Sequence, residues 1–180
     1  MLLFVAMAFC QAPAPKDSFD YFFNKRKEAV IGLPYPKFSF KTEEGKTFSN
    51  ADIEGKISFI NLWFEACPPC IAELASVNAL YLKYKNDKRF VFMSFTFETP
   101  KKIKQLKKKY HLQYPIISIS KAESYRLNQN FGFPVNIILD KKETIQYLNC
   151  GGNTNTTEVK IYFTKTVYDK INGLLKAYTN

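Results

Sequence analysis

The stretch Ile57–Cys70, with the sequence ISFINLWFEACPPC, decides the fold. Its first part, Ile57–Phe64, is almost continuously apolar, as expected of a central strand buried on both faces of a sheet. A helix is predicted from about Pro68 to Tyr84, because apolar residues recur there at helical spacing. The pair Cys67 and Cys70 therefore stands where a buried strand passes into a helix.

This position suits redox chemistry. The first turn of a helix has unpaired backbone N–H groups and a partial positive charge, which lower the pKa of a thiol there and favour the reactive thiolate. The spacing lets Cys70 reach back to Cys67 and close a small disulfide ring. Pro68 and Pro69 are tolerated because proline's missing N–H costs little in the first turn. The pattern favours a dithiol redox site.

Two other interpretations of the pair remain. A structural zinc site needs four ligands, usually two cysteine pairs or a cysteine pair with a histidine pair. Cys10, Cys150 and His111 are isolated in the sequence, so we expect no metal. An inert structural disulfide is the second alternative.

Outward from the motif, strands alternate with helices and a hairpin with a helix follows. This order predicts a mixed α/β sheet covered on both faces, in a single domain over residues 17–180. Strands are expected at 37–42, 47–49, 90–95, 115–119, 135–140 and 144–148. Further helices are expected at 17–31, 100–110 and 121–130. A C-terminal helix should bury a stripe of Val159, Phe163, Val167, Ile171 and Leu174.

Composition supports a globular chain. The 180 residues are 46% hydrophobic, which excludes wholesale disorder, and four cysteines are too few for a disulfide-stapled miniprotein. The net charge is +10, and lysines crowd residues 101–109. Such a face is usually solvated, although it can attract acidic partners or an anionic membrane. We expect no nucleic-acid binding, since no interleaved aromatic pattern accompanies the lysines.

The N-terminus resembles an export signal. Met1–Phe9 is apolar and uncharged, and it is too short to span a bilayer core of about 30 Å. Ala6-Met7-Ala8 fits a small-x-small cleavage pattern, and Cys10 is a candidate for lipid attachment. Residues 1–16 are therefore interpreted as a signal-like segment and linker, and we expect export to the periplasm or cell envelope.

Together, these motifs resemble the thioredoxin superfamily, and within it the exported TlpA/ResA-type oxidoreductases. The resemblance runs from about Ile31 to the C-terminus. It is carried by five segments: 33–38 (LPYPKF), 54–56 (EGK), 61–64 (NLWF), 67–73 (CPPCIAE) and 132–134 (GFP). It implies a thioredoxin-like fold with an added N-terminal β-hairpin and an inserted element in the middle.

The resemblance also implies roles. Cys67 is the expected nucleophile and Cys70 the resolving thiol. Asn61 stands where classical thioredoxins carry a buried Asp. In TlpA/ResA-type proteins with this exchange, a Glu three residues after the second cysteine can serve as the ionisable group, and Glu73 stands at that position. We expect Asn61 to satisfy a hydrogen bond beneath the site. Glu65 is a less expected second carboxylate.

Substrate contacts are expected around the pair. Pro134 matches the family's cis-proline, which shapes substrate binding, although Val135 stands where the family often has Thr. We assign Trp63, Pro68, Pro69, Phe133 and Pro134 to the substrate-binding surface. Cys150 and His111 are expected to be bystanders.

The predicted function is reduction of protein disulfides, with the Cys67–Cys70 couple as redox centre and no separate cofactor. The expected partners are a protein disulfide or dithiol substrate and a membrane-bound electron donor, and we expect a monomer. One alternative is a thiol peroxidase of a related branch, which would use a lone peroxidatic cysteine. Another is a metal chaperone or binding module on the same scaffold.

Overall fold

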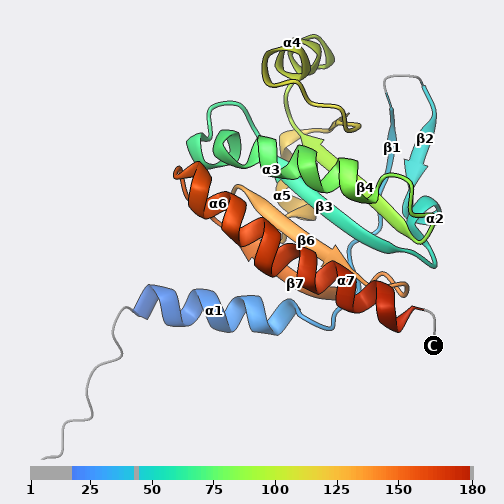
Figure 1. The fold of residues 1–180 in the computed structure, drawn as a ribbon, viewed down its shortest axis with the longest axis vertical. Helices are drawn as coiled ribbons and strands as arrows, with labels where there is room; N and C mark the ends of the chain where they lie inside the picture. The colour runs from blue at the N-terminus through green and yellow to red at the C-terminus, as the bar shows by residue number, and fades with distance from the viewer. Residues whose placement is uncertain (1–17, 43–44, 179–180) are drawn as a thin grey trace, which may run out of the picture.

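The computed structural model describes residues 18–42 and 45–178, so the signal-like segment and Cys10 lie outside the described residues. Within them, five strands form one mixed sheet and two more form a hairpin (Figure 1). The sheet has the spatial order β5 (Ile117–Ser118), β4 (Phe90–Thr96), β3 (Ile57–Trp63), β6 (Val135–Leu139) and β7 (Ile145–Cys150). The hairpin pairs β1 (Ser39–Lys41) with β2 (Thr47–Ser49).

Strand β3 lies at the centre of the sheet, as its apolar run predicts. It pairs in parallel with β4 and antiparallel with β6, and all seven of its residues are buried. Phe59 and Trp63 belong to the core on one face, whereas Ile60 and Leu62 belong to the core on the other. Because a strand's side chains alternate between faces, Asn61 points to the same side as Phe59 and Trp63.

The helices cover both faces of the sheet (Figure 1). They are α1 (Ser18–Val30), α2 (Asn50–Ile53), α3 (Pro68–Tyr84), α4 (Pro100–Tyr110), α5 (Lys121–Leu127), α6 (Thr156–Tyr162) and α7 (Tyr168–Ala177). α3 and the C-terminal helices pack on the face that carries Phe59 and Trp63. α1, α5 and the hairpin contribute to the opposite core. The mixed α/β architecture expected from the element order is confirmed.

The C-terminal helix contains a π-helical segment, Phe163–Val167, between α6 and α7. The first four members of the predicted stripe are spaced four residues apart, which drifts by about 40° per step on a regular α-helix of 3.6 residues per turn. A wider π-turn absorbs this drift, so the stripe stays buried along the sheet. The stripe ends at Leu175, which is buried, while Leu174 is only partly buried.

Some elements are shorter than predicted. The strand expected at 115–119 comprises only Ile117–Ser118, and the helix expected at 121–130 ends at Leu127. Gln129 and Asn130 both take positive φ values, of 58° and 57°, which a continuing α-helix does not allow. No helix in the described part of the chain is long and apolar enough to cross a membrane.

Candidate active site

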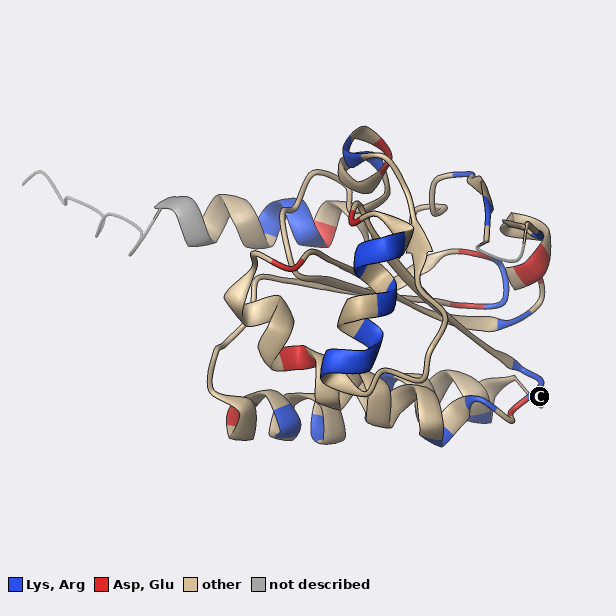
Figure 2. Cartoon of the chain, turned by 90° about the horizontal axis from the view of Figure 1, so that it is seen from above, with Lys and Arg blue, Asp and Glu red and all other residues tan. Residues whose placement is uncertain are grey.

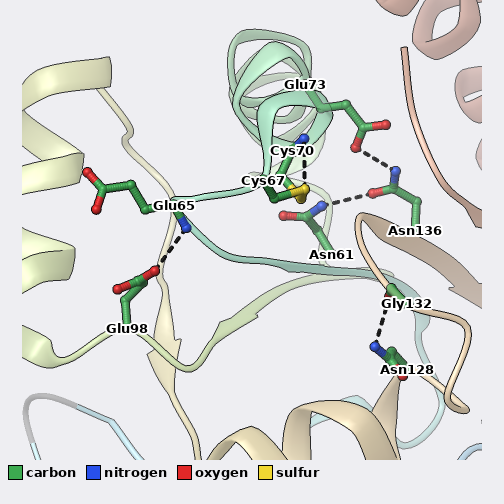
Figure 3. The surroundings of a disulfide bond; sticks show 9 residues. All are labelled: Asn61, Glu65, Cys67, Cys70, Glu73, Glu98, Asn128, Gly132 and Asn136. Atoms are coloured by element: carbon green, nitrogen blue, oxygen red, sulfur yellow. Dashed lines mark hydrogen bonds between the residues drawn. A yellow bond between two sulfur atoms is a disulfide. The ribbon is translucent and has the colours of Figure 1, made fainter. Parts of the chain in front are cut away.

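Cys67 and Cys70 are joined by a disulfide at the start of α3 (Figure 3). Cys67 is the N-cap residue of the helix, and its Sγ accepts a hydrogen bond from the backbone N–H of Cys70 at 3.3 Å. Only 5% of Cys67 and 1% of Cys70 is exposed to solvent. An N–H directed at Cys67 Sγ, at the positive end of a helix, favours a thiolate there once the disulfide is reduced.

The two intervening prolines determine which backbone N–H of the helix reaches Cys67. Pro68 and Pro69 occupy the first two positions of α3 and have no N–H group. The first N–H that the helix can offer is therefore that of Cys70, and it is the one that Cys67 Sγ accepts. Pro68 is exposed and Pro69 partly exposed, so both stand at the surface around the pair.

The loop before β6 forms a second side of the site, in addition to Pro68 and Pro69. The Phe133–Pro134 peptide bond is cis, as expected at this position, and the Asn128 side chain holds the loop by donating to the Gly132 carbonyl at 2.9 Å. The Phe133 ring forms T-shaped, edge-to-face contacts with the rings of Phe64 and Tyr125, with centroids 5.3 and 5.4 Å away. These aromatic residues are only partly buried or exposed, so the wall is apolar and reachable.

Trp63 does not share this surface. It is fully buried, and its Nε1–H donates to Ser94 Oγ at 2.9 Å. It faces the core beneath α3 because it is the last residue of β3 on that face of the sheet. The sequence-based assignment of Trp63 to substrate contact is therefore wrong, and the residue is a support under the site.

Glu73 lies one turn beyond Cys70 on α3, and only 2% of it is exposed. Burial raises the pKa of this carboxyl to about 7, while a hydrogen bond from Asn136 Nδ2 to its Oε2, at 2.9 Å, acts in the opposite direction. A carboxyl with a pKa near neutrality can both take up and release a proton under physiological conditions. The geometry fits the acid–base role expected of Glu73.

Asn136 is a site residue that the sequence analysis missed. It accepts a hydrogen bond from Asn61 Nδ2 at 3.0 Å and donates to Glu73, so it connects the two residues that were predicted (Figure 3). The signal available in the sequence was its polarity, since it is the one polar residue in the buried strand Val135–Leu139.

Gly152 was missed as well. A β-carbon at this position would stand 3.0 Å from Pro69 Cβ, 3.1 Å from Pro134 Cγ and 3.4 Å from Glu73 Oε1. Because residue 152 is a glycine, the backbone after β7 can lie directly against Pro69, Pro134 and the buried Glu73 carboxyl. A pocket of about 260 Å³ opens beside it, lined by Glu73, Asn149, Gly152, Asn153, Glu158, Val159 and Tyr162. The glycine pair at 151–152 was the sequence signal.

The remaining candidates lie apart from the pair. Glu65 is about one third exposed and forms an ion pair with Lys102 at 2.7 Å, so Glu73 is the buried carboxylate of the site. Cys150 belongs to the core on the other face of the sheet, where burial raises its pKa to about 11. His111 is exposed and caps the end of α4. Among the described residues, no cluster of three or more His, Cys, Asp or Glu side chains is placed to hold a metal ion.

A mixed sheet with a Cys-Pro-Pro-Cys disulfide at the start of a helix, beside a cis-proline, defines a thioredoxin-like protein with a dithiol–disulfide centre. The chain belongs to the AhpC/TSA family, whose model matches residues 31–148.

Known relatives agree with this class. The chain is 30% identical over 120 residues to the thiol-disulfide oxidoreductase ResA of Bacillus cereus, covering 67% of this chain and 69% of the relative. It is 31% identical over 133 residues to the thioredoxin-like protein YneN of Bacillus subtilis, covering 72% and 78%. The solution structure of a putative thioredoxin from Neisseria meningitidis superposes with a TM-score of 0.62 at 25% identity, covering 79% and 89%.

Proposed function

We propose that this protein is a thiol–disulfide oxidoreductase that reduces disulfides of protein substrates through the Cys67–Cys70 couple. The observation that carries the proposal is the disulfide at the N-terminus of α3, with Cys67 Sγ accepting the Cys70 N–H. The ResA relatives, which are named thiol-disulfide oxidoreductases, support it. They do not favour the thiol peroxidase or the metal-binding module.

The reaction starts from the reduced protein. The Cys67 thiolate attacks one sulfur of a substrate disulfide, a Cys67–substrate disulfide forms, and the other substrate sulfur leaves as a thiolate. The positive end of α3 and the Cys70 N–H stabilise the Cys67 thiolate before the attack. Cys67 is the nucleophile because its sulfur is the one that accepts this hydrogen bond.

Cys70 completes the exchange. Its thiol loses a proton and attacks Cys67 Sγ, so that the Cys67–Cys70 disulfide forms and the second substrate sulfur leaves as a thiolate. Two electrons have then passed from the protein to the substrate. Glu73, one helical turn from Cys70, takes up the Cys70 proton in its ionised form. The pocket beside Gly152 gives this carboxyl a route for proton exchange with solvent.

Pro68, Pro69 and Phe133 are the exposed or partly exposed residues of the substrate-binding surface, and the buried Pro134 shapes it through its cis peptide bond. The aromatic wall around Phe133 suits an apolar segment of a polypeptide next to the target disulfide. A protein disulfide fits this shallow surface better than a small molecule, which would need an enclosing pocket. The disulfide itself serves as the redox centre, without a further cofactor.

The setting of the reaction completes the proposal. The signal-like start supports export to the periplasm or cell envelope, where disulfides persist. A reductase there must itself be reduced, so we expect a membrane-bound donor of two electrons as its partner. We propose that the protein works as a monomer, because the exchange needs only groups from one chain.

Insulin-disulfide reduction in the presence of dithiothreitol tests this function. Wild-type protein should accelerate the reduction, Cys67→Ser should abolish the acceleration, and Cys70→Ser should trap a mixed disulfide that mass spectrometry detects. Cys150→Ser, at a buried thiol on the other face, is the matched control and should retain activity. Full activity in Cys67→Ser would refute the proposal. Peroxide consumption that depends on Cys67 would favour the peroxidase.

A further inference from the structure

A row of polar side chains crosses the sheet beneath α3. Ser94 on β4 and Asn136 on β6 both stand opposite Asn61 on β3, at the same register. At most 2% of each of these residues is exposed. Neighbouring residues at one register point to the same face, so the three side chains form a continuous line under the helix that carries Glu73.

Hydrogen bonds run along this row without a break. Trp63 Nε1 donates to Ser94 Oγ at 2.9 Å, and Ser94 Oγ donates to Asn61 Oδ1 at 3.5 Å. Asn61 Nδ2 donates to Asn136 Oδ1 at 3.0 Å, and Asn136 Nδ2 donates to Glu73 Oε2 at 2.9 Å (Figure 3). Ser94, Asn61 and Asn136 each accept from the previous residue and donate to the next.

The direction of this chain is fixed by its first member. An indole Nε1–H is a donor only, so Ser94 must accept from Trp63, and its hydroxyl proton is left to donate to Asn61. With its oxygen occupied, the Asn61 amide presents its NH₂ group to Asn136. The same logic turns the NH₂ group of Asn136 toward Glu73. A flipped amide anywhere in the row would bring two donors or two acceptors together in a buried site.

We propose that Asn136, Asn61 and Ser94 form a positioning relay that starts at Trp63 and directs one N–H donor onto the Glu73 carboxyl. These residues act through Glu73 and touch neither sulfur nor substrate. This N–H donor stabilises the ionised carboxyl and so opposes the effect of burial, which keeps the ionised form accessible near neutral pH. This inference rests on the proposed role of Glu73 as the proton acceptor for Cys70.

Other titratable groups surround the carboxyl. They are Cys67 at the N-cap of α3, Cys70 on α3, Tyr114 before β5, Tyr147 on β7, and Glu158 and Tyr162 on α6. Burial raises the pKa of all three tyrosines above the usual value, so they stay neutral across the range in which a carboxyl titrates. In the oxidised protein the two cysteines do not titrate. Glu158 is exposed, and it stays unchanged in every variant of the test.

The test reads the carboxyl directly. The oxidised protein is labelled with ¹³C at the glutamate side-chain carboxyl, and the Glu73 signal, identified by its loss in Glu73→Gln, is titrated from pH 4 to 10. Asn136→Leu removes the donor, and Ser94→Ala breaks the relay two hydrogen bonds from the carboxyl. Ser58→Ala is the matched control, because Ser58 is a fully buried serine on β3 whose hydroxyl has no partner among the described residues.

The relay predicts a rise in the Glu73 midpoint of about one pH unit in Asn136→Leu, since a buried ionised group then loses its donor. Ser94→Ala should shift the midpoint in the same direction by a smaller amount, and Ser58→Ala should leave it unchanged. Ser94→Ala removes only a hydroxyl, so it keeps the test valid if Asn136→Leu does not fold. An unchanged midpoint in Asn136→Leu, or equal shifts in Ser94→Ala and Ser58→Ala, would overturn the relay.

The pH profile of insulin reduction separates this inference from the proposed function. If the Glu73 midpoint moves in Asn136→Leu and the activity profile moves with it, both are supported. If the midpoint moves while the activity profile stays in place, the relay exists but Glu73 is not the proton acceptor, and the functional part of the inference is overturned. Absence of disulfide-reducing activity in the wild-type protein would instead count against the proposed function.

Discussion

Gly152 lies so close to Pro134 that a β-carbon on the glycine would stand 3.1 Å from the proline Cγ. The same β-carbon would stand 3.0 Å from Pro69 Cβ. Ordinary contacts between carbon atoms are about 3.5–4.0 Å, so a larger residue requires Pro69, Pro134 or the loop after β7 to give by a few tenths of an ångström. The position needs a residue without a side chain because of this close approach.

We predict that Gly152→Ala lowers the rate of insulin reduction several-fold and costs about 1 kcal/mol of stability through overpacking. The neighbouring glycine supplies the control. Gly151 has a φ of +72°, and a β-carbon there would meet nothing within 4 Å, so Gly151→Ala should cost a similar amount through backbone strain alone. Steady-state kinetics and urea unfolding of both variants check this. Equal losses of activity in the two variants would contradict the role of Gly152 at the site.

Glu73 should make stability depend on pH. Its pKa is raised from 4.5 to about 7 in the folded protein, so the native state binds the proton more tightly than the unfolded state does. The free energy of unfolding therefore falls as pH rises through this window, by about 3 kcal/mol in total. This loss of stability is absent below pH 4.5 and complete above pH 7.

Glu73→Gln removes this titration. We predict that urea unfolding of the oxidised proteins gives nearly equal stabilities near pH 4, and that the variant becomes the more stable protein by up to about 3 kcal/mol at pH 8. The glutamine oxygen can still accept from Asn136, so the fold should tolerate the change. Parallel stability profiles for the two proteins would show that the carboxyl does not titrate in this range.

Helix α4 should steer acidic substrates toward the site. Lysines recur along it, as the blue segments of the helix in Figure 2 show. Lys102 pairs with Glu65, two residues before Cys67, which ties the helix to the active-site loop. Lys104 and Lys108 are exposed one turn apart on the same helix. Charges of this kind raise the association rate of oppositely charged partners at low salt.

We predict that Lys104→Glu/Lys108→Glu slows the reaction with an acidic disulfide peptide by up to about tenfold at low ionic strength. The difference should vanish at high salt, where charges are screened over a few ångströms. Lys85→Glu/Lys88→Glu is the control, since it changes the net charge equally beyond the far end of α3. Stopped-flow rates decide the matter, and equal slowing by both double variants would mean that the position of the lysines is irrelevant.

The chemical motif and the helices around it are readable from the sequence for definite reasons. α3 and α4 have the predicted bounds because each begins at a proline and carries apolar residues at helical spacing. β3 is identified by its almost continuously apolar run. Cys67, Cys70, Glu73 and the cis-proline then follow from the motifs and the family resemblance.

The rest of the site depends on contacts between distant segments. Ser94, Asn61 and Asn136 form a row only through the register of three strands, and the pattern of one strand does not fix that register. Gly152 lies against Pro69 and Pro134 because of the path that the loop after β7 takes. The burial of Trp63 depends in the same way on the helix packed above it.

The redox equilibrium of the Cys67–Cys70 pair against glutathione or dithiothreitol, read by mass-tagging of free thiols, is the most direct test of the proposed function. We predict one reversible two-electron couple with a low, thioredoxin-like potential of about −270 mV or below, as a disulfide reductase requires. A potential nearer about −120 mV would contradict the reductase direction and indicate an oxidant. The absence of any reversible couple would contradict the assignment of the pair as a redox centre.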